Sequence, residues 1–369
     1  MTKFIMVIKT NASKLAIVFH PGVTLAEKLE EMGMGIKEFA VRTSKPEKTI
    51  IAVVKGNSSL TTEMAVSFEN VTKIPASFWL KKQQMYDEFL VRKNRETTMA
   101  ASVDWMRQFP VTEMAKRGWI AAKTTVEEKV NELFSFFGIS TEKAWADYYL
   151  NQQLKVAFRI SLSGMKDPHA MSAWLREGDI LANEICPDAA FSEKELRRAL
   201  PKMKEIMAKE PKDFLKQLQD VCLSCGVKLI CTPCLPKAPI GGATRWINDY
   251  PVVQIASRHK RYDIFWFNFF HEIGHILLHG KKEIFLEKAG HFDQDVKKEK
   301  EADDFAANIV LAKEDESTIV LRNKYSRTAI IAAAKEFGTH PSVIVGRLQH
   351  DGIIKYNQGQ FLIKKVDFS

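Results

Sequence analysis

The sequence predicts a mainly α protein with a smaller α+β part, and three observations support this fold class. Residues 24–90 carry a series of short helical patterns broken by glycine and proline, and longer amphipathic patterns continue through residues 96–205. Strand-like runs appear only later, in "VKLICTP", "GGATRWI" and "PVVQIAS". An apolar helix follows them, and the C-terminal residues predict helix, turn, helix and a short hairpin, "GIIKYNQGQFLIKK".

Length and composition suggest several domains in a cytoplasmic protein. The 369 residues predict domains at 1–95, 96–205, 206–320 and 321–369. The apolar runs are too short to cross a bilayer, the N-terminus lacks a signal-peptide pattern, and five cysteines without a secretion signal fit reduced thiols. The net charge is +9, and residues 1–100 carry 15 Lys and Arg against 10 Asp and Glu. Either solvated basic faces or contact with nucleic acid would explain this charge.

The first hundred residues contain the spacing of a helix-turn-helix. "TLAEKLEEMG" predicts a helix that stops at Gly33, and Thr61 and Pro75 are suited to the starts of two later helices. Between them, "IKEFAVRT", a turn at Ser44–Pro46 and "EKTIIAVVKG" have the lengths of the two helices of the motif and the turn that joins them.

This stretch resembles the HigA-type antitoxins over some seventy residues. The shared features include His-Pro-Gly at His20–Gly22 and Phe-Trp-Leu at Phe78–Leu80. The resemblance implies a lambda-repressor-like domain whose second motif helix, Pro46–Lys55, enters the major groove of operator DNA. The alternatives are a helical bundle with no nucleic-acid role and a module that binds protein rather than DNA. The residues expected at the DNA are Lys37, Arg42, Lys45, Glu47, Lys48, Thr49 and Lys55.

Three positions depart from the family pattern in ways that weaken base recognition. Ile36 stands where a polar residue usually opens the first motif helix, and Pro46 and Ala52 replace polar residues of the second. Lysine and arginine contacts to phosphate remain, whereas side chains that read base edges are lost. We therefore expect salt-sensitive, weakly selective binding by a monomer, with selectivity recovered by a homodimer that reads two half-sites or by apolar contacts with thymine methyl groups.

Residues 96–205 predict a helical connecting domain and carry no recognisable chemistry. Beyond them, the four cysteines of C-x-x-C-x5-C-x-x-C leave two interpretations open, because convergence of the two pairs is geometrically allowed but not required. These residues either hold a second, structural zinc ion or are free thiols, and they are Cys222, Cys225, Cys231 and Cys234.

The apolar run "FFHEIGHILLHG" predicts a metal-binding helix. His271 and His275 are four residues apart and share a helix face, with Glu272 beside the first histidine. Two imidazoles in this spacing can hold zinc, and the glutamate can take a proton from its water. The alternative is a packing helix whose histidines satisfy one another. His279 continues the same face, but it cannot reach a metal that its neighbours bind, so we expect a structural role.

A second helix, "EKEADDFAAN", offers the third ligand. Its Glu-x-x-Ala-Asp run resembles the Glu-x-x-Ser-Asp of thermolysin-like zinc enzymes, which implies Glu299 as ligand and Asp303 as hydrogen-bond partner of a ligand histidine. Glu301 competes with Glu299 for the metal. Since it is two positions away, we expect it to face elsewhere and to belong to a charged surface.

Residues 210–355 resemble the ImmA/IrrE metallo-endopeptidases, including members fused to antitoxins. The resemblance rests on "DIFWFNFFHEIGHILLHG", "EKEADDFAANIVL" and "HPSVIVGRLQHDGII". It implies a zincin-like domain that uses Zn²⁺ and Glu272 to cut a specific regulatory protein, such as a cognate toxin. The alternative is a non-cleaving antitoxin that sequesters a toxin and represses its own operon. The oxyanion-stabilising residue stays open among Tyr250, Arg347 and His340.

Overall fold

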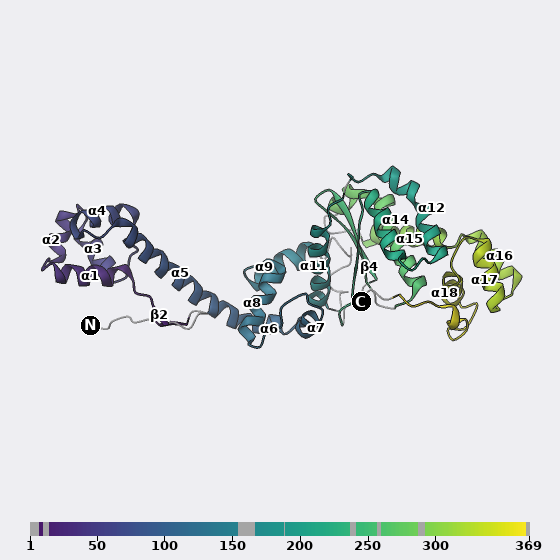
Figure 1. Cartoon of the computed structure of the whole chain (residues 1–369), viewed down its shortest axis with the longest axis horizontal. Helices are drawn as coiled ribbons and strands as arrows, with labels where there is room; N and C mark the ends of the chain where they lie inside the picture. The colour runs from purple at the N-terminus through teal and green to yellow at the C-terminus, as the bar shows by residue number, and fades with distance from the viewer. Residues whose placement is uncertain are drawn as a thin grey trace. The chain divides into compact units, whose positions relative to one another are not determined.

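The computed structural model describes residues 7–9, 15–153, 167–187, 189–236, 241–256, 260–286 and 292–366. The chain divides into two compact units, Met1–Ala101 and Ser102–Ser369, each of which has its own core (Figure 1). Among the helices described, none has the length and apolar character needed to cross a membrane.

The first unit is a helical bundle preceded by a two-stranded antiparallel sheet. Its elements are β1 (Val7–Lys9), β2 (Leu15–Ile17), α1 (Pro21–Glu31), α2 (Ile36–Arg42), α3 (Glu47–Val54), α4 (Thr62–Thr72) and α5 (Ala76–Ala101). The Thr61 side chain accepts a hydrogen bond from the Met64 amide at the start of α4, which confirms the predicted N-cap. Phe39, Phe68 and Trp79 are fully buried and pack edge to face at the centre of the bundle.

The structure gives a local reason for the His-Pro-Gly sequence before α1. The His20 Nδ1 atom accepts a hydrogen bond from the Gly22 amide at 3.0 Å and so caps the helix, while Pro21 occupies its first turn. A Cβ atom at Gly22 would lie 1.9 Å from the Val53 carbonyl oxygen. Glycine is therefore required here, because the backbones of α1 and α3 approach too closely for any side chain.

The second unit begins with a series of helices, the first of which surround an aromatic cluster. These helices are α6 (Val103–Met106), α7 (Val111–Lys116), α8 (Val126–Phe137), α9 (Glu142–Trp145), the π-helix η1 (Ala146–Gln153), α11 (Pro168–Glu184), α12 (Glu193–Lys209) and α13 (Phe214–Ser224). Trp105, Phe109, Phe134 and Trp145 are buried against one another, and Trp145 stacks on His169 of α11. Within the predicted helical stretch, α9 thus packs onto α11.

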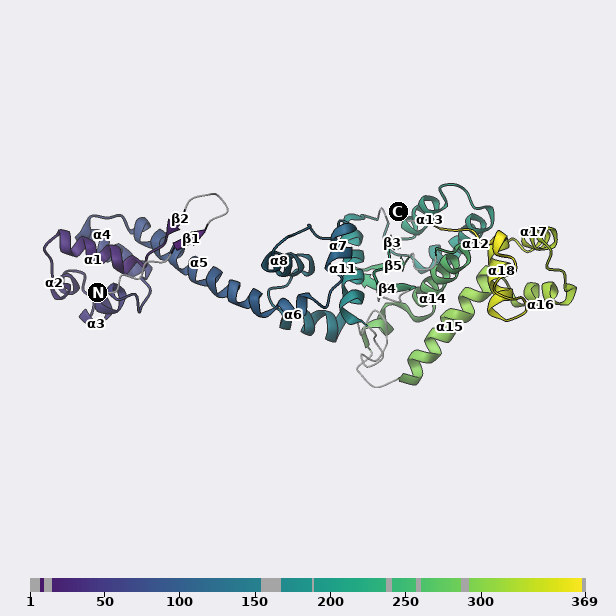
Figure 2. The same cartoon turned by 90° about the horizontal axis from the view of Figure 1, so that it is seen from below.

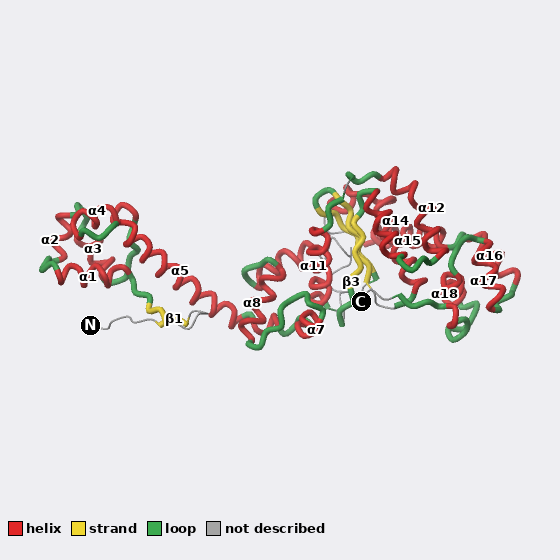
Figure 3. Tube along the Cα trace, in the orientation of Figure 1, coloured by secondary structure: helices red, strands yellow, loops and turns green. Residues whose placement is uncertain are grey.

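A three-stranded sheet lies between α11 and α14 and confirms the three predicted strands (Figures 1 and 3). The strands are β3 (Lys228–Thr232), β4 (Gly242–Ile247) and β5 (Tyr250–Ala256), in the order β3-β5-β4. β5 pairs in parallel with β3 and antiparallel with the edge strand β4. Successive side chains of a strand point to opposite faces. Accordingly, Thr244 of β4 reaches Glu272 of α14, while Arg245 bonds Asp179 of α11 at 2.7 Å.

The helices after the sheet, which include those that carry the candidate site, complete the second unit. They are α14 (Tyr262–Leu286), α15 (Phe292–Val310), α16 (Lys313–Arg322), α17 (Arg327–Glu336), α18 (Pro341–His350) and the 3-10 helix η3 (Gln360–Leu362). Trp266, Phe269, Phe270 and Ile273 of α14 are buried in the main core of the unit. α15 packs along α14, and Figure 2 shows the pair beside α18. Burial of one face of α14 leaves its other face to the candidate site.

Two predictions about this region are wrong. The polar residues 280–297 predict an insertion between the two site helices, but the described part of this run is helical, since α14 continues to Leu286 and α15 begins at Phe292. The expected C-terminal hairpin contains turns and η3 instead. The Gln349 side-chain amide donates to the carbonyls of Tyr356 and Gln358, at 3.1 and 2.8 Å, so these groups are not left for a strand ladder.

Candidate metal centre

The structure brings the three predicted ligands together between α14 and α15. The Nε2 atoms of His271 and His275 are 3.0 Å apart, and each lies 3.3 Å from a carboxylate oxygen of Glu299. One ligand atom from each residue falls within 4.8 Å of the others. Two imidazole nitrogens and one carboxylate form a donor set that suits zinc and leaves a position for water.

The close approach of α15 depends on a glycine in the motif. A Cβ atom at Gly274 would lie 3.1 Å from the Phe305 ring and 3.4 Å from the Ala302 Cα atom. Ala302 and Ala306 are fully buried at the same contact. Small residues on both helices allow their axes to approach, which brings Glu299 within reach of two histidines on the neighbouring helix.

Charge interactions link the histidines to the acids of α15. His271 Nδ1 lies 2.8 Å from an oxygen of Asp303, as the sequence predicts. Burial disfavours the protonated form of His271, but the hydrogen bonds to Asp303 and Glu299 outweigh it and raise its pKa to about 10. Burial likewise opposes ionisation of Glu299, yet the two histidines hold its pKa well below the usual range. The acidic groups around His271 therefore favour a positive charge at this position.

Glu272 is held next to the three candidate ligands by the edge strand. Its side chain is buried, and the Thr244 hydroxyl donates a hydrogen bond to one carboxylate oxygen at 2.7 Å. A Cβ atom at Gly242 would lie 2.6 Å from the other oxygen. Thr244 and Gly242, two residues apart on β4, thus orient the glutamate and leave room for it. Neither residue could be predicted from the sequence, because their approach to Glu272 depends on how β4 lies across α14.

Glu301 does not join the group of three ligands, as predicted, but it does contact α14. Its carboxylate lies 3.2 Å from His279 Nε2, and His279 Nδ1 lies 3.1 Å from His275 Nδ1. The Glu301 side chain is 44% exposed and lies 3.7 Å from Lys297, so it belongs to a charged surface, and its contact with His279 is an addition that its spacing did not predict. The interaction requires α15 to run close to α14 over more than one turn.

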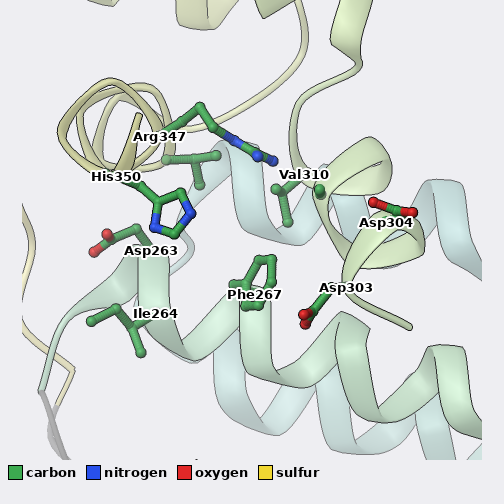
Figure 4. A pocket seen from close by; sticks show the side chains of 11 residues that line it. Asp263, Ile264, Phe267, Asp303, Asp304, Val310, Arg347 and His350 are labelled. Carbon is green, nitrogen blue, oxygen red and sulfur yellow. The ribbon is translucent and has the colours of Figure 1, made fainter. Parts of the chain in front are cut away.

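A cavity of about 430 Å³ opens beside Asp303 (Figure 4). Apolar side chains of α14, α15 and α18 form much of its wall, and Arg347 and His350 reach in from α18. Its lining residues are Asp263, Ile264, Phe267, Asp303, Asp304, Ala307, Val310, Val343, Gly346, Arg347 and His350. Phe267 and Asp263 precede His271 at intervals of four residues. The cavity therefore continues the helix face that carries the candidate ligands.

The three residues considered for oxyanion stabilisation fall in different places. Arg347 lines the cavity, where its guanidinium lies 3.9 Å from Glu316. Tyr250 lies at the start of β5 beneath the Lys228 ammonium, 5.5 Å from the ring centre. The His340 side chain caps α18, and its Nε2 atom lies 3.1 Å from a Glu210 carboxylate oxygen. Both nitrogens of the His340 ring are therefore already engaged. Of the three, Arg347 alone lines the same cavity as Asp303.

The four closely spaced cysteines form no ligand cluster in the described part of the chain. None of the four is in a disulfide, and the group of possible metal ligands found among the described residues consists of His271, His275 and Glu299. Burial raises the pKa of Cys222 and Cys231, which disfavours the thiolate that a metal requires. These observations favour the free-thiol interpretation.

The residues expected at DNA lie on or beside α2 and α3, with different surroundings. Lys37, Glu47, Lys48 and Lys55 are exposed and Thr49 is half-buried. Arg42 forms an ion pair with Glu38 at 2.6 Å. Lys45 forms an ion pair with Glu63, and the Lys45 side chain is only 14% exposed. Ile36 packs against the core of the unit, which explains why a polar residue is not found there.

Comparison with protein families agrees with this location of the site. Residues 234–349 match the family model described as Peptidase M78, IrrE N-terminal-like domain. This match supports a metallopeptidase-like domain and covers β4, β5 and the helices that hold the three candidate ligands. A search of curated proteins gives no match.

Proposed function

We propose that this protein is a cytoplasmic regulator of a toxin–antitoxin kind, which cleaves a specific partner protein with zinc and binds DNA through its first unit. The observation that carries the peptidase proposal is the meeting of His271, His275 and Glu299, with Glu272 held beside them. The family match over residues 234–349 supports the same reaction class. The resemblance to HigA-type antitoxins supports the regulatory role.

In this proposal, each residue has a distinct role in peptide hydrolysis. His271, His275 and Glu299 hold the zinc ion, which when bound acts as a Lewis acid on the scissile carbonyl and acidifies a water molecule. Glu272 accepts a proton from the attacking water and delivers it to the leaving amine. Thr244 keeps the Glu272 carboxylate oriented, and Asp303 orients the His271 ring.

The cavity beside Asp303 supports a restricted substrate choice. It is large enough for one or more side chains and is bounded by Phe267 and Val343, with Arg347 at its wall. A peptide that lies across the metal would place a neighbouring side chain in this space. We therefore expect cleavage to depend on a large apolar side chain near the scissile bond rather than on any accessible peptide.

The DNA-binding part of the proposal depends on the exposed cations of α2 and α3. Lys37, Lys48 and Lys55 are exposed and can contact phosphates. Ion pairs with Glu38 and Glu63 partly neutralise Arg42 and Lys45, so these two residues contribute less than the sequence suggests. Binding should be salt-sensitive and weakly selective for a monomer.

Capture with a Glu272→Gln variant tests the peptidase proposal. The variant should retain zinc and hold its partner uncut, because glutamine cannot accept the proton from water. Partners recovered with the variant are then incubated with the wild-type protein, and their lengths are measured by mass spectrometry. We expect one partner to be shortened by the wild type and left intact by the variant. If every captured partner stays full-length with the zinc-loaded wild type, the protein is instead a non-cleaving antitoxin.

A further inference from the structure

His279 occupies a defined place behind the candidate metal centre. It lies one turn after His275 on α14, and its side chain is only 3% exposed. One ring nitrogen, Nδ1, is 3.1 Å from Nδ1 of His275, and the other, Nε2, is 3.2 Å from a Glu301 oxygen. The three side chains therefore form a continuous line of hydrogen-bonding contacts from α14 to α15.

The metal-binding role of His275 determines where each proton in this line must lie. His275 faces His271 and Glu299 through Nε2, so Nε2 must be unprotonated to bind a metal. The proton of the neutral ring is then on Nδ1. This N–H can donate to His279 only if Nδ1 of His279 is an acceptor. The His279 proton is consequently on Nε2, where it donates to the Glu301 carboxylate.

We propose that His279 and Glu301 act as positioning residues that hold His275 in its metal-binding tautomer. This inference rests on the proposed zinc site. His279 would bond the Nδ1 atom of His275, on the side of the ring away from the metal, as Asp303 bonds the Nδ1 atom of His271. All the carboxylates involved come from α15: Glu299 binds the metal directly, Asp303 supports one histidine, and Glu301 supports the other through His279.

Burial makes such a partner more important for His275 than for a surface histidine. The His275 side chain is 8% exposed, against 16% for His271, so water has little access to replace a lost acceptor. A buried N–H without an acceptor is unfavourable, and the ring would turn or adopt the other tautomer. The other tautomer places a proton on Nε2, in the position of the metal.

Three substitutions at His279 separate hydrogen bonding from packing. In His279→Asn, the amide oxygen can occupy the position of Nδ1 and accept from His275. In His279→Gln, the amide lies farther out, near the position of Nε2, and His279→Ala has neither group. Zinc affinity of the full-length protein is measured by competition with a chelator, and thermal unfolding without zinc reports on folding. Asp304→Ala is the control on α15.

We expect the alanine and glutamine variants to bind zinc about ten- to a hundred-fold more weakly than the wild type, while asparagine stays within about three-fold. Equal zinc affinity in the wild type and all three variants would overturn the inference. An asparagine variant as weak as alanine would also overturn it, because packing would then explain the loss. A wild-type protein that binds no zinc would contradict the proposed function itself, which is a different outcome.

Discussion

Replacement of Asp303 by alanine should weaken zinc binding through His271. Asp303 lies 2.8 Å from His271 Nδ1 and contacts none of the other candidate ligands. A hydrogen bond to a charged group contributes about 1.5–3 kcal/mol, which corresponds to about 10- to 150-fold in affinity. The Asp303 side chain is 55% exposed, so solvent screens the interaction and the lower end of this range applies.

Proton competition reduces the expected effect further. Against the opposing effect of burial, the Asp303 hydrogen bond helps to raise the pKa of His271 to about 10, so the metal-free protein carries a proton there at pH 7. Zinc must displace this proton, and removal of Asp303 makes the displacement easier. We therefore expect a loss of about ten-fold at pH 7 for Asp303→Ala, close to the smallest effect usual for such partners.

Chelator competition at a fixed pH measures this loss directly. Asp304→Ala is a matched control, because Asp304 is adjacent and exposed, and the structure gives it no hydrogen bond or ion pair within the described residues. Asp303→Asn should fall between the wild type and alanine, since a neutral acceptor remains. If Asp303→Ala and Asp304→Ala bind zinc with the same affinity as the wild type, the reasoning about His271 is wrong.

The other predictions concern Glu272, the first unit and DNA. Gly242→Ala should lower cleavage of the captured partner at least ten-fold with unchanged zinc affinity, because its Cβ atom would lie 2.6 Å from the Glu272 carboxylate; equal cleavage rates would contradict this geometry. Burial lowers the pKa of His20, so its stabilising contribution is complete above about pH 6.5 and is lost as the pH falls through the lowered value. Amide exchange in α1, corrected for intrinsic rates, should accelerate between pH 7.5 and 5.5 in the wild type and change less in His20→Asn. Lys48→Ala should weaken binding to promoter and scrambled DNA equally and reduce the salt dependence, whereas a loss confined to the promoter would indicate base recognition.

Much of the candidate site follows from local periodicity and could be predicted. His271 and His275 share a face because four residues complete about one helical turn, and the same spacing joins Glu299 to Asp303. The strands before them are marked by β-branched and aromatic residues between turns, and β3, β4 and β5 confirm that pattern.

The contacts that no sequence pattern predicts depend on how helices and strands cross in space. Thr244 reaches Glu272 because of the register of β4 and its position over α14, and neither is encoded in a short motif. Glu301 meets His279 because small residues let α15 run close along α14. The predicted C-terminal hairpin fails for a related reason, since the side chain of Gln349, on α18, binds two of the carbonyl groups involved.

Zinc content is the measurement that tests the central claim most directly. Protein purified without added chelator is analysed by elemental mass spectrometry, as the wild type and as a His271→Ala, His275→Ala double variant, with folding checked by circular dichroism. The proposed centre predicts about one zinc per wild-type chain and almost none in the folded double variant. Full zinc occupancy in the double variant would contradict the assignment of His271, His275 and Glu299 as the metal centre.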